Sequence, residues 1–516
     1  MSKTVAAILA GISLCAVAAH SRADEYVGQA NKAYQDIKNE LRSDLTILPL
    51  IAAMDRPPAA ARDIETAMLM PVSSAGWADC AIWAQKPAQQ AAIEGLKKVT
   101  ERQKGKEQWA FGLPYGTDGV PLAIIKAKAY AEVGDPPTLS AAQLYYQPML
   151  VNLAVLVQIE ATRLVSENKG PEAADLMLNW VCFARQLSDR QFYREATWGL
   201  DQMQVGLHRL RDVLYSDFRG SRTIDIPMLQ KYLERLNEKD AIQTDRIKFP
   251  RADQIGAEQI VARVFIPRKG ADERVFATTL ASIGSAAQPM RLFSEAARWR
   301  SAAVSHKDQI DTSKMLDIVC GDFSARWPEE YYSRRMLQPY EYSKLNQGEY
   351  SVILATIPDM ESLINQKQAI RIEAVGTRLA IAHLGLFYER KSFGPTVASV
   401  QPFWQKVLEK DPFNISPRAA GNPPMEYFVP IRDQPRGPRE DPKPHVMNIV
   451  AGSGTNFAAP VSDDTFVIYS CGSDNHKNWA VLIQNTIVKV EGADYLIWPP
   501  LVALERKHLL ESGLLK

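Results

Sequence analysis

The spacing of apolar residues between positions 171 and 215 constrains the fold of this chain most strongly. Apolar residues recur there at intervals of three and four, which places them on one face of an α-helix. One such stripe consists of Ala173, Leu176, Trp180, Ala184 and Leu187. A second runs from Leu200 to Leu214. Neither helix can bury its stripe alone, so the pattern predicts an irregular helical bundle or an α-solenoid-like array.

The residues before the first stripe predict where two helices meet. We expect Gly170 to take the left-handed position that closes the preceding helix, and Pro171 to open the next. The preceding apolar stretch, residues 149–165, is interrupted by Asn152, Gln158 and Glu160. It therefore reads as a buried helix rather than a membrane span.

The first 23 residues have the pattern of a secretory signal peptide. Lys3 supplies a positive charge, Val5 to Ala19 is apolar, and Ser21-Arg22-Ala23 offers small residues at a cleavage site. We predict cleavage before Asp24 and export to the periplasm or the extracellular space. A retained membrane anchor is the alternative, although the apolar run is shorter than the roughly 20 residues that span a bilayer.

Charge and cysteine content narrow the choice of partners. Removing Lys3 and Arg22 from the 60 basic residues leaves 58 against 59 acidic ones. No basic stripe is available for phosphates, so nucleic acid is not an expected partner. We expect no transmembrane anchor after cleavage.

The cysteines that remain have no CxxC spacing, which argues against zinc, and they can form disulfides or stay isolated thiols. They are Cys80, Cys182, Cys320 and Cys471.

The chain predicts a mostly α protein with a change of character near residue 366. An α-helical body is expected over 24–365, with a further break near 240. A small α+β module with a short antiparallel sheet is expected over 366–516. Its elements are a helix around 370–386, a short helix over 400–408, strands in MEYFVPI, DTFVIYS and WAVLI, and a final helix over 501–514. The stretch between 412 and 454 reads as Pro- and Gly-rich loops.

The C-terminal 130 residues resemble the soluble domain of type II secretion major pseudopilins. That family ends its long helix in Tyr and then shows an Asp-Pro-aromatic turn, a Tyr-Ser-x-Gly-x-Asp strand and turn, and a closing Ala-Asp with Trp. The matching positions are Tyr388, Gly394-Pro395, Asp411-Pro412-Phe413, Tyr469-Ser470, Gly472, Asp474, Ala493-Asp494 and Trp498. The family's prepilin cleavage site and polymerising N-terminal helix are missing, so we do not expect a pilus subunit. The whole chain looks like large exported bacterial proteins that carry such a tail behind a helical body.

The resemblance implies a calcium site in the acidic C-terminal turn. Carried over by position, it places Asp474 and Asp494 at the ion, and Asn475 could add an amide oxygen. Calcium prefers six to eight oxygen ligands, which these three side chains supply only in part. The alternative is that Asp474 and Asn475 shape a turn through hydrogen bonds to the backbone.

Catalytic patterns are weak. Glu329 and Glu330 stand beside aromatic residues and could serve glycoside hydrolysis. Adjacent residues on a helix point about 100° apart, however, and after Pro328 the pair also fits the acidic first turn of a helix. We therefore expect a non-catalytic exported protein with a protein-interaction or scaffold role and an unidentified protein partner. The alternative is an exported hydrolase whose site lies between the helical body and the C-terminal module.

Overall fold

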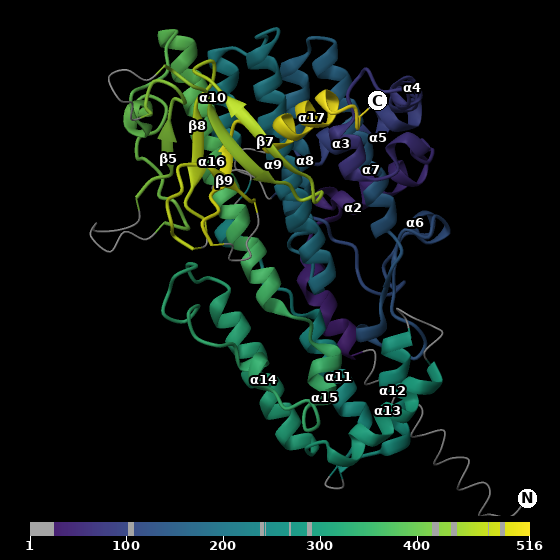
Figure 1. The fold of residues 1–516 in the computed structure, drawn as a ribbon. Helices are drawn as coiled ribbons and strands as arrows, with labels where there is room; N and C mark the ends of the chain where they lie inside the picture. Colours follow the sequence, from purple (N-terminus) through teal and green to yellow (C-terminus); the bar gives the residue numbers. More distant parts are fainter. Residues whose placement is uncertain are drawn as a thin grey trace, which may run out of the picture.

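The computed structural model describes residues 25–515, apart from 102–107, 238–241, 243, 268–269, 286–291, 415–422, 435–440, 473 and 486–490. The predicted signal peptide lies outside these residues, and so does most of the predicted break near 240. The described chain is a mostly α body with a small α+β module at its C-terminal end (Figure 1), which confirms the predicted fold class.

Three long helices form the centre of the body. They are α7 (Gln147–Ser166), α8 (Gly170–Leu187) and α9 (Tyr193–Arg219). Every residue of the predicted stripe on α8 is buried. A Cβ atom at Gly206 of α9 would lie 2.7 Å from Cγ2 of Val181, so a glycine there permits the close approach of α8 and α9.

Shorter elements surround these helices. Residues 25–35 are helical and begin the described chain. The remaining helices and strands of this part of the body are α2 (Ser43–Ala52), α3 (Ile64–Leu69), α4 (Trp77–Ala84), α5 (Pro87–Lys98), α6 (Leu122–Lys126), β1 (Ala131–Glu132), β2 (Gln143–Leu144) and α10 (Ile226–Leu236).

Helix α7 lies inside the bundle, as its interrupted apolar pattern predicts. Among the described residues it is the single helix long and apolar enough to cross a membrane. Most of that apolar stretch is buried, however, and α7 packs against α2, α3 and α8. It is placed as the core helix of a bundle.

The turn between α7 and α8 differs from the prediction. Asn168, with φ 58°, takes the left-handed position, and Gly170 is already the first residue of α8. Asparagine tolerates this conformation because its short polar side chain can bond locally. Gly170 serves packing instead, since a Cβ there would lie 2.6 Å from Oδ1 of Asp217.

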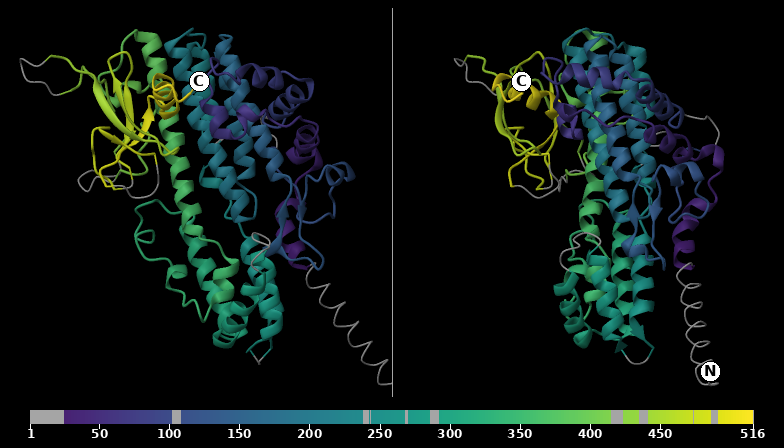
Figure 2. Two further views of the ribbon diagram at one scale, coloured as in Figure 1. Left: turned by 45° about the vertical axis from the view of Figure 1, so that its right-hand side comes forward. Right: turned by 90° about the vertical axis from the view of Figure 1, so that its right-hand side faces the viewer.

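A second group of helices forms the lower part of Figure 1, with its own apolar cluster. One long helix, α16 (Met360–Arg390), runs from this group up to the module and passes the predicted boundary near residue 366 (Figures 1 and 2). The elements of the lower group are α11 (Ala252–Val264), β3 (Phe265–Ile266), β4 (Gly270–Ala271), α12 (Glu273–Ser285), α13 (Leu292–Ser305), α14 (Gln309–Arg326) and α15 (Ser351–Thr356).

The C-terminal module contains two small sheets beside α16 (Figure 2). The strand order is β10-β8-β5 in the antiparallel sheet and β7-β6-β9 in the other, where β6 pairs with β7 in antiparallel and with β9 in parallel fashion. The elements are β5 (Glu426–Phe428), β6 (His445–Val450), β7 (Asn456–Val461), β8 (Val467–Ser470), β9 (Leu482–Ile483), β10 (Tyr495–Trp498) and α17 (Leu501–Glu511).

Two sequence predictions for this module are wrong. The hairpin of β6 and β7 falls where loops are predicted, and its turn is the Gly-rich segment 451–455. Residues 401–408 are turns, and only a 3₁₀ turn over Val397–Val400 precedes them. Pro402 cannot donate a helical hydrogen bond, and Trp404 is buried. The four cysteines among the described residues are free thiols, so none of the pairings left open by the sequence is formed.

A buried ionic cluster centred on Glu373 of α16 attaches the module to the body. Nη1 of Arg211, on α9, lies 2.5 Å from Oε2 of Glu373, and Nε2 of His208 lies 2.5 Å from Oε1. Tyr495 of β10 donates its hydroxyl to the same carboxylate. Burial alone would raise the pKa of Glu373, but the charges of Arg211 and His208 outweigh it and hold the pKa at about 2. Two other segments, α9 and β10, therefore converge on one carboxylate of α16.

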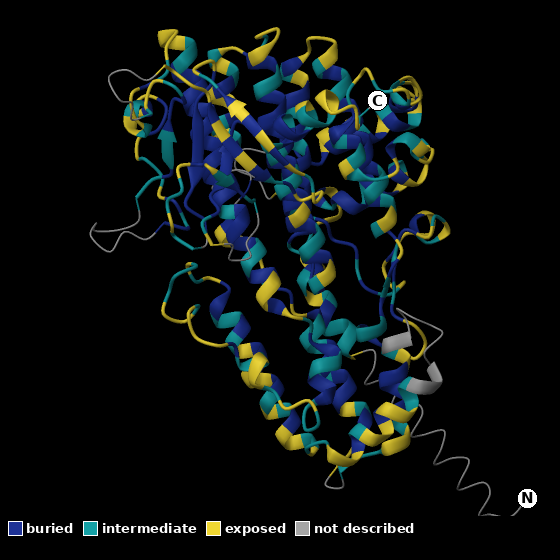
Figure 3. Ribbon diagram, viewed as in Figure 1, coloured by how far each residue is buried: buried dark blue, intermediate teal, exposed yellow. Residues whose placement is uncertain are grey.

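A second cluster anchors the final helix. Arg506 of α17 donates Nη1 and Nη2 to the two oxygens of Asp212, at 3.0 and 2.8 Å. Arg209 pairs with the same carboxylate. Arg506 also donates to the backbone carbonyl of Met68, which ties α17 to the end of α3. Figure 3 shows that the contact between module and body is largely buried, while exposed residues concentrate on the outer helix faces and on the lower group.

We expect Glu373→Gln to lower the free energy of unfolding by about 3–5 kcal/mol. The change leaves the buried Arg211 guanidinium without a counter-charge. Urea denaturation at neutral pH measures the effect. The matched control is Glu341→Gln, which breaks the exposed pair of Glu341 and Lys344 and should cost less than about 1 kcal/mol. Equal losses in the two variants would contradict a docking role for Glu373.

Candidate functional site

The structure brings the residues of the predicted calcium site close together in the module. Asp474 accepts hydrogen bonds from the backbone N–H of His476 at Oδ1 (2.9 Å) and of Gly492 at Oδ2 (2.6 Å). Asn475 has φ 56°, the left-handed conformation that a tight turn uses. Asp474 thus joins its own turn to the segment that leads into β10.

Asp494 is fully buried and holds the neighbouring turn. Its Oδ1 accepts the backbone N–H of Asn478 at 3.3 Å, and its Oδ2 accepts that of Ala480 at 2.6 Å. Burial raises the pKa of Asp494 to about 7, against the effect of these two hydrogen bonds. The nearby charge of Asp474 acts in the same direction as burial.

All four carboxylate oxygens of Asp474 and Asp494 therefore accept backbone hydrogen bonds. An aspartate that shapes a turn accepts hydrogen bonds from backbone N–H groups, whereas an aspartate that binds calcium directs its oxygens toward the ion. No group of three or more His, Cys, Asp or Glu side chains in the described part of the chain could hold a metal ion. The geometry favours the turn, and calcium binding stays a prediction that no contact in the structure tests.

The turn held by Asp494 presents a tryptophan to solvent. Trp479 and Ala480 both have φ 56°, an unusual conformation for two successive residues with side chains. The Trp479 side chain is 55% exposed. Nζ of Lys477 lies 3.8 Å from the centre of its ring and pairs with Glu426 of β5 at 2.7 Å. The indole is therefore fixed from one side and open on the other.

Val481 and Val446, in the same part of the module, are exposed as well. Val481 follows Trp479 and Ala480, and its carbonyl accepts the N–H of Asn448 of β6. Val446 lies two residues before Asn448, and both residues are on the exposed face of β6. We call the exposed ring of Trp479, with the exposed Val481 two residues later, the Trp479 patch.

The alternative catalytic pair occupies a turn. Glu329 and Glu330 follow the end of α14, and no helix begins after Pro328, so the expected acidic first turn of a helix is wrong. The chain turns because Arg326 donates to the carbonyls of Arg335, Gln338 and Pro339. The carbonyl of Glu329 accepts hydrogen bonds from α16, and the Glu330 side chain is exposed.

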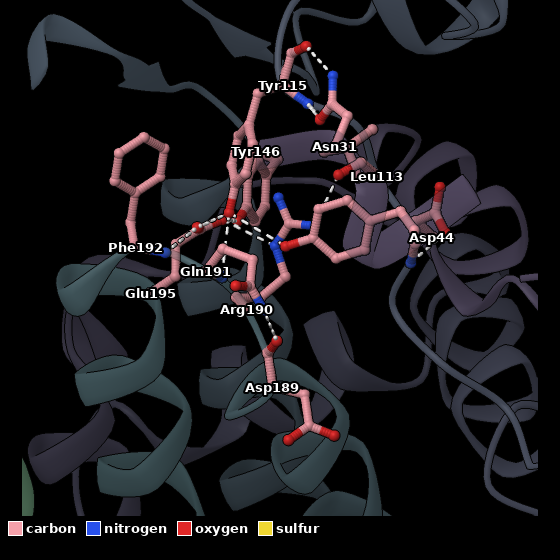
Figure 4. Close-up of polar contacts among 12 residues, drawn as sticks. Asn31, Asp44, Leu113, Tyr115, Tyr146, Asp189, Arg190, Gln191, Phe192 and Glu195 are labelled. Carbon is pink, nitrogen blue, oxygen red and sulfur yellow. Dashed lines mark hydrogen bonds and ion pairs between the residues drawn. The ribbon is translucent and has the colours of Figure 1, made fainter. Parts of the chain in front are cut away.

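Sequence reasoning missed a buried polar cluster in the body, centred on Arg190 and Glu195 (Figure 4). Nε of Arg190 lies 2.9 Å from Oε1 of Glu195, and these side chains are only 1% and 2% exposed. The guanidinium carbon lies 4.4 Å from the ring centre of Tyr34 and 4.7 Å from that of Tyr115. Arg190 is thus held by a carboxylate and by aromatic faces.

Glu195 is also the acceptor for tyrosine hydroxyls. Tyr115 donates to Oε2 at 2.6 Å, and Tyr146 donates to Oε1. Burial raises the pKa of Tyr115 and of Tyr146 well above the usual value, and the charge of Glu195 adds to this rise. Burial alone would lower the pKa of Arg190, but Glu195 reverses the effect and the pKa is raised. Tyr115, Tyr146 and Arg190 therefore stay protonated, which suits a structural core.

The cluster fixes the loop FGLPYG, residues 111–116. Arg190 donates Nη1 to the carbonyl of Leu113 at 2.6 Å. Asn31 bonds both the backbone N–H and the carbonyl of Tyr115, at 2.8 and 2.9 Å. Asp44 accepts the N–H of Gly112 at 2.8 Å. The loop is therefore tied to residues 25–35, to α2 and to the start of α9.

Two cavities flank this loop and share Tyr34 as a wall. The first has a volume of 160 Å³ and lies between α8 and residues 108–111. We call it the body cavity. The second, of 590 Å³, lies between the first described helix and the 112–119 loop. No family model, curated protein or solved structure matches the chain, so these features rest on the geometry alone.

The raised pKa of Asp494 predicts a pH dependence of stability. Asp494 binds its proton more tightly in the folded protein than in the unfolded one, so it contributes most to the free energy of unfolding in acid. This contribution is lost as the pH rises from about 4 through 7. The free energy of unfolding of Asp494→Asn, relative to that of wild type, should therefore rise by on the order of 2 kcal/mol between pH 4.5 and 7.5. Urea denaturation across this range measures the difference.

The control for this prediction is Asp464→Asn, which removes a carboxylate that is 54% exposed. The difference in free energy of unfolding between this control and wild type should change much less over the same pH range. A constant difference for Asp494→Asn as well would contradict the inferred protonation of Asp494.

Proposed function

We propose that the protein is an exported, non-catalytic interaction protein that binds a protein partner through the Trp479 patch. One observation carries the proposal: a buried carboxylate, Asp494, holds a strained turn that leaves Trp479 exposed. Placing a residue with a side chain in the left-handed region costs roughly 1–2 kcal/mol. Such strain persists where the surroundings over-determine it, and it concentrates at binding sites.

The chemistry of the patch suits protein recognition. Tryptophan is among the residues that dominate binding energy at protein interfaces. A ring fixed in advance loses less freedom on binding, which favours affinity. Lys477 supplies a positive charge at the edge of the patch. That charge is already paired with Glu426, so we expect a partner that offers an apolar pocket for the indole.

The attachment of the module supports a scaffold role. Glu373 and Asp212 fix the module to α9 through buried ion pairs, so the patch is held on the body as part of one rigid unit. The resemblance to pseudopilin soluble domains supports looking first among components of type II secretion. The hydrolase alternative gains no support from Glu329 and Glu330, since one acts through its carbonyl and the other is exposed.

The test compares the proteins captured from an extract of the host's exported proteins. We expect the wild-type protein to enrich at least one partner, and Trp479→Ser to reduce that enrichment at least tenfold. Quantitative mass spectrometry measures both. The matched control is Val304→Ser, which removes an apolar side chain that is 74% exposed on α13.

A further variant, Asp494→Asn, keeps the indole but loosens the turn that holds it. We expect it to weaken capture of the partner less than Trp479→Ser does. If Trp479→Ser captures the same proteins in the same amounts as wild type, the Trp479 patch is not the interface. Circular dichroism of each variant separates lost binding from lost folding.

A further inference from the structure

One short loop of the module carries the two most exposed large apolar side chains in the described part of the chain. Phe403 is 81% exposed and Val407 is 77% exposed. Single apolar side chains scattered over a surface are ordinary, whereas an aromatic ring and a valine exposed together in one loop mark an interaction site. We call residues 401–408 the Phe403 loop.

The Phe403 loop is fixed to the rest of the protein by its inward-facing side chains. The backbone N–H of Trp404 donates to the carbonyl of Val400 at 3.0 Å, which closes the turn. Trp404 itself is buried against α16, where Gly385 leaves no room for a Cβ atom beside the indole ring. Leu408 packs against the core four residues later. The shape of the loop is therefore set by contacts within the protein.

The outward-facing residues lie directly before the inward-facing ones. Phe403 precedes the buried Trp404, and Val407 precedes Leu408. The loop thus directs two apolar side chains into the core and leaves the other two in water. Because the backbone is already ordered, contact of the exposed pair with an apolar phase costs little further conformational freedom.

The exposed side of the loop is also positively charged. Lys406 and Lys410 are exposed, and the ammonium group of neither forms an ion pair with a described residue. Glu409 is the one acidic residue of segment 401–410, and it is already paired with Arg378 of α16, whose Nε lies 2.7 Å from Oε1. Two uncompensated positive charges therefore flank the exposed Val407.

The size and chemistry of this surface suit a lipid bilayer. One aromatic side chain buries roughly 150–250 Å². A standard protein interface buries roughly 800 Å² on each partner, which a single loop of this kind does not supply. A bilayer needs no matching pocket, because apolar side chains enter its interface while lysines stay in water and attract anionic headgroups.

We propose that the Phe403 loop is a peripheral contact with anionic phospholipid membranes. Phe403 and Val407 enter the boundary between headgroups and acyl chains, and Lys406 and Lys410 face the lipid phosphates. The protein is then held at a membrane surface without a transmembrane helix. The proposal does not depend on the Trp479 patch, since vesicle binding tests the one and capture of a protein tests the other.

Flotation with lipid vesicles tests the contact. The protein is recovered after export, and its intact mass is checked for loss of residues 1–23, because an uncleaved apolar N-terminus would bind vesicles by itself. We expect binding to phosphatidylcholine vesicles that contain about 30% phosphatidylglycerol to be roughly tenfold tighter than to phosphatidylcholine alone. Salt at about 1 M should remove most of this preference, because it screens charges beyond about 3 Å.

Three variants separate the apolar contribution from the charged one. Phe403→Ser should weaken binding to both kinds of vesicle by roughly tenfold or more, because it removes the apolar ring. Phe403→Trp keeps an aromatic ring and should bind as wild type does. The double variant Lys406→Gln/Lys410→Gln should lose the preference for phosphatidylglycerol and still bind weakly to both kinds of vesicle.

The matched control replaces one exposed valine by serine at two places. Val304 of α13 is 74% exposed, nearly as much as Val407. Val407→Ser should weaken vesicle binding, and Val304→Ser should leave it unchanged. Thermal melts of each variant show that it folds, which these exposed positions favour.

Three results would overturn the assignment: no flotation of the wild-type protein with the phosphatidylglycerol vesicles, unchanged binding by Phe403→Ser, or equal weakening by Val304→Ser. Repeating the capture of exported proteins with Phe403→Ser identifies the alternative occupant. A captured protein that this variant loses, without vesicle binding by wild type, would make the loop a protein interface and the lipid assignment wrong.

Discussion

Charges buried along α9 must be paired, and the partners come from almost every other part of the chain. Glu195 receives Arg190 and two tyrosines near its first turn. Arg211 meets Glu373 of α16, and Asp212 meets Arg506 of α17. Because an unpaired buried charge is so costly, these pairs fix the relative positions of the helices more narrowly than apolar packing alone could. Apolar stripes make the bundle form, and the ion pairs select one arrangement.

The helices could be predicted from the sequence because their signal is local. The stripe on α8 lies within 18 residues, and all of its members are buried. The hairpin of β6 and β7 was missed because β7 contains Pro460, which argues against a strand, and because its turn, 451–455, has the composition of a flexible loop. Its alternating burial appears only when the two strands pair. Gly170 serves packing and Asn168 takes the left-handed position, and this difference from the prediction likewise depends on Asp217, which is distant in the sequence.

The candidate sites likewise combine features that the local sequence predicts with features that depend on distant residues. Asp474 and Asp494 could be identified from the sequence as neighbours, but whether their oxygens face a cation or the backbone is a matter of side-chain direction. Arg190 and Glu195 gave no pattern because Tyr115 lies 80 positions from Glu195. A charged pair in the short link between two strongly apolar helices is the signal that could have found this region.

The ionic cluster at Glu373 has a consequence for how the chain is made. Tyr495 lies 291 positions after Gln204, which donates to its hydroxyl, and 122 positions after Glu373, which accepts from it. Helices α7 to α9 can form early from local contacts, but the contact of Glu373 with Tyr495 joins residues 122 positions apart and is expected to form later. A chain that stops short carries a full helical body with an incompletely satisfied carboxylate at its centre. The module therefore completes the hydrogen bonding of a carboxylate that the body alone leaves unfinished.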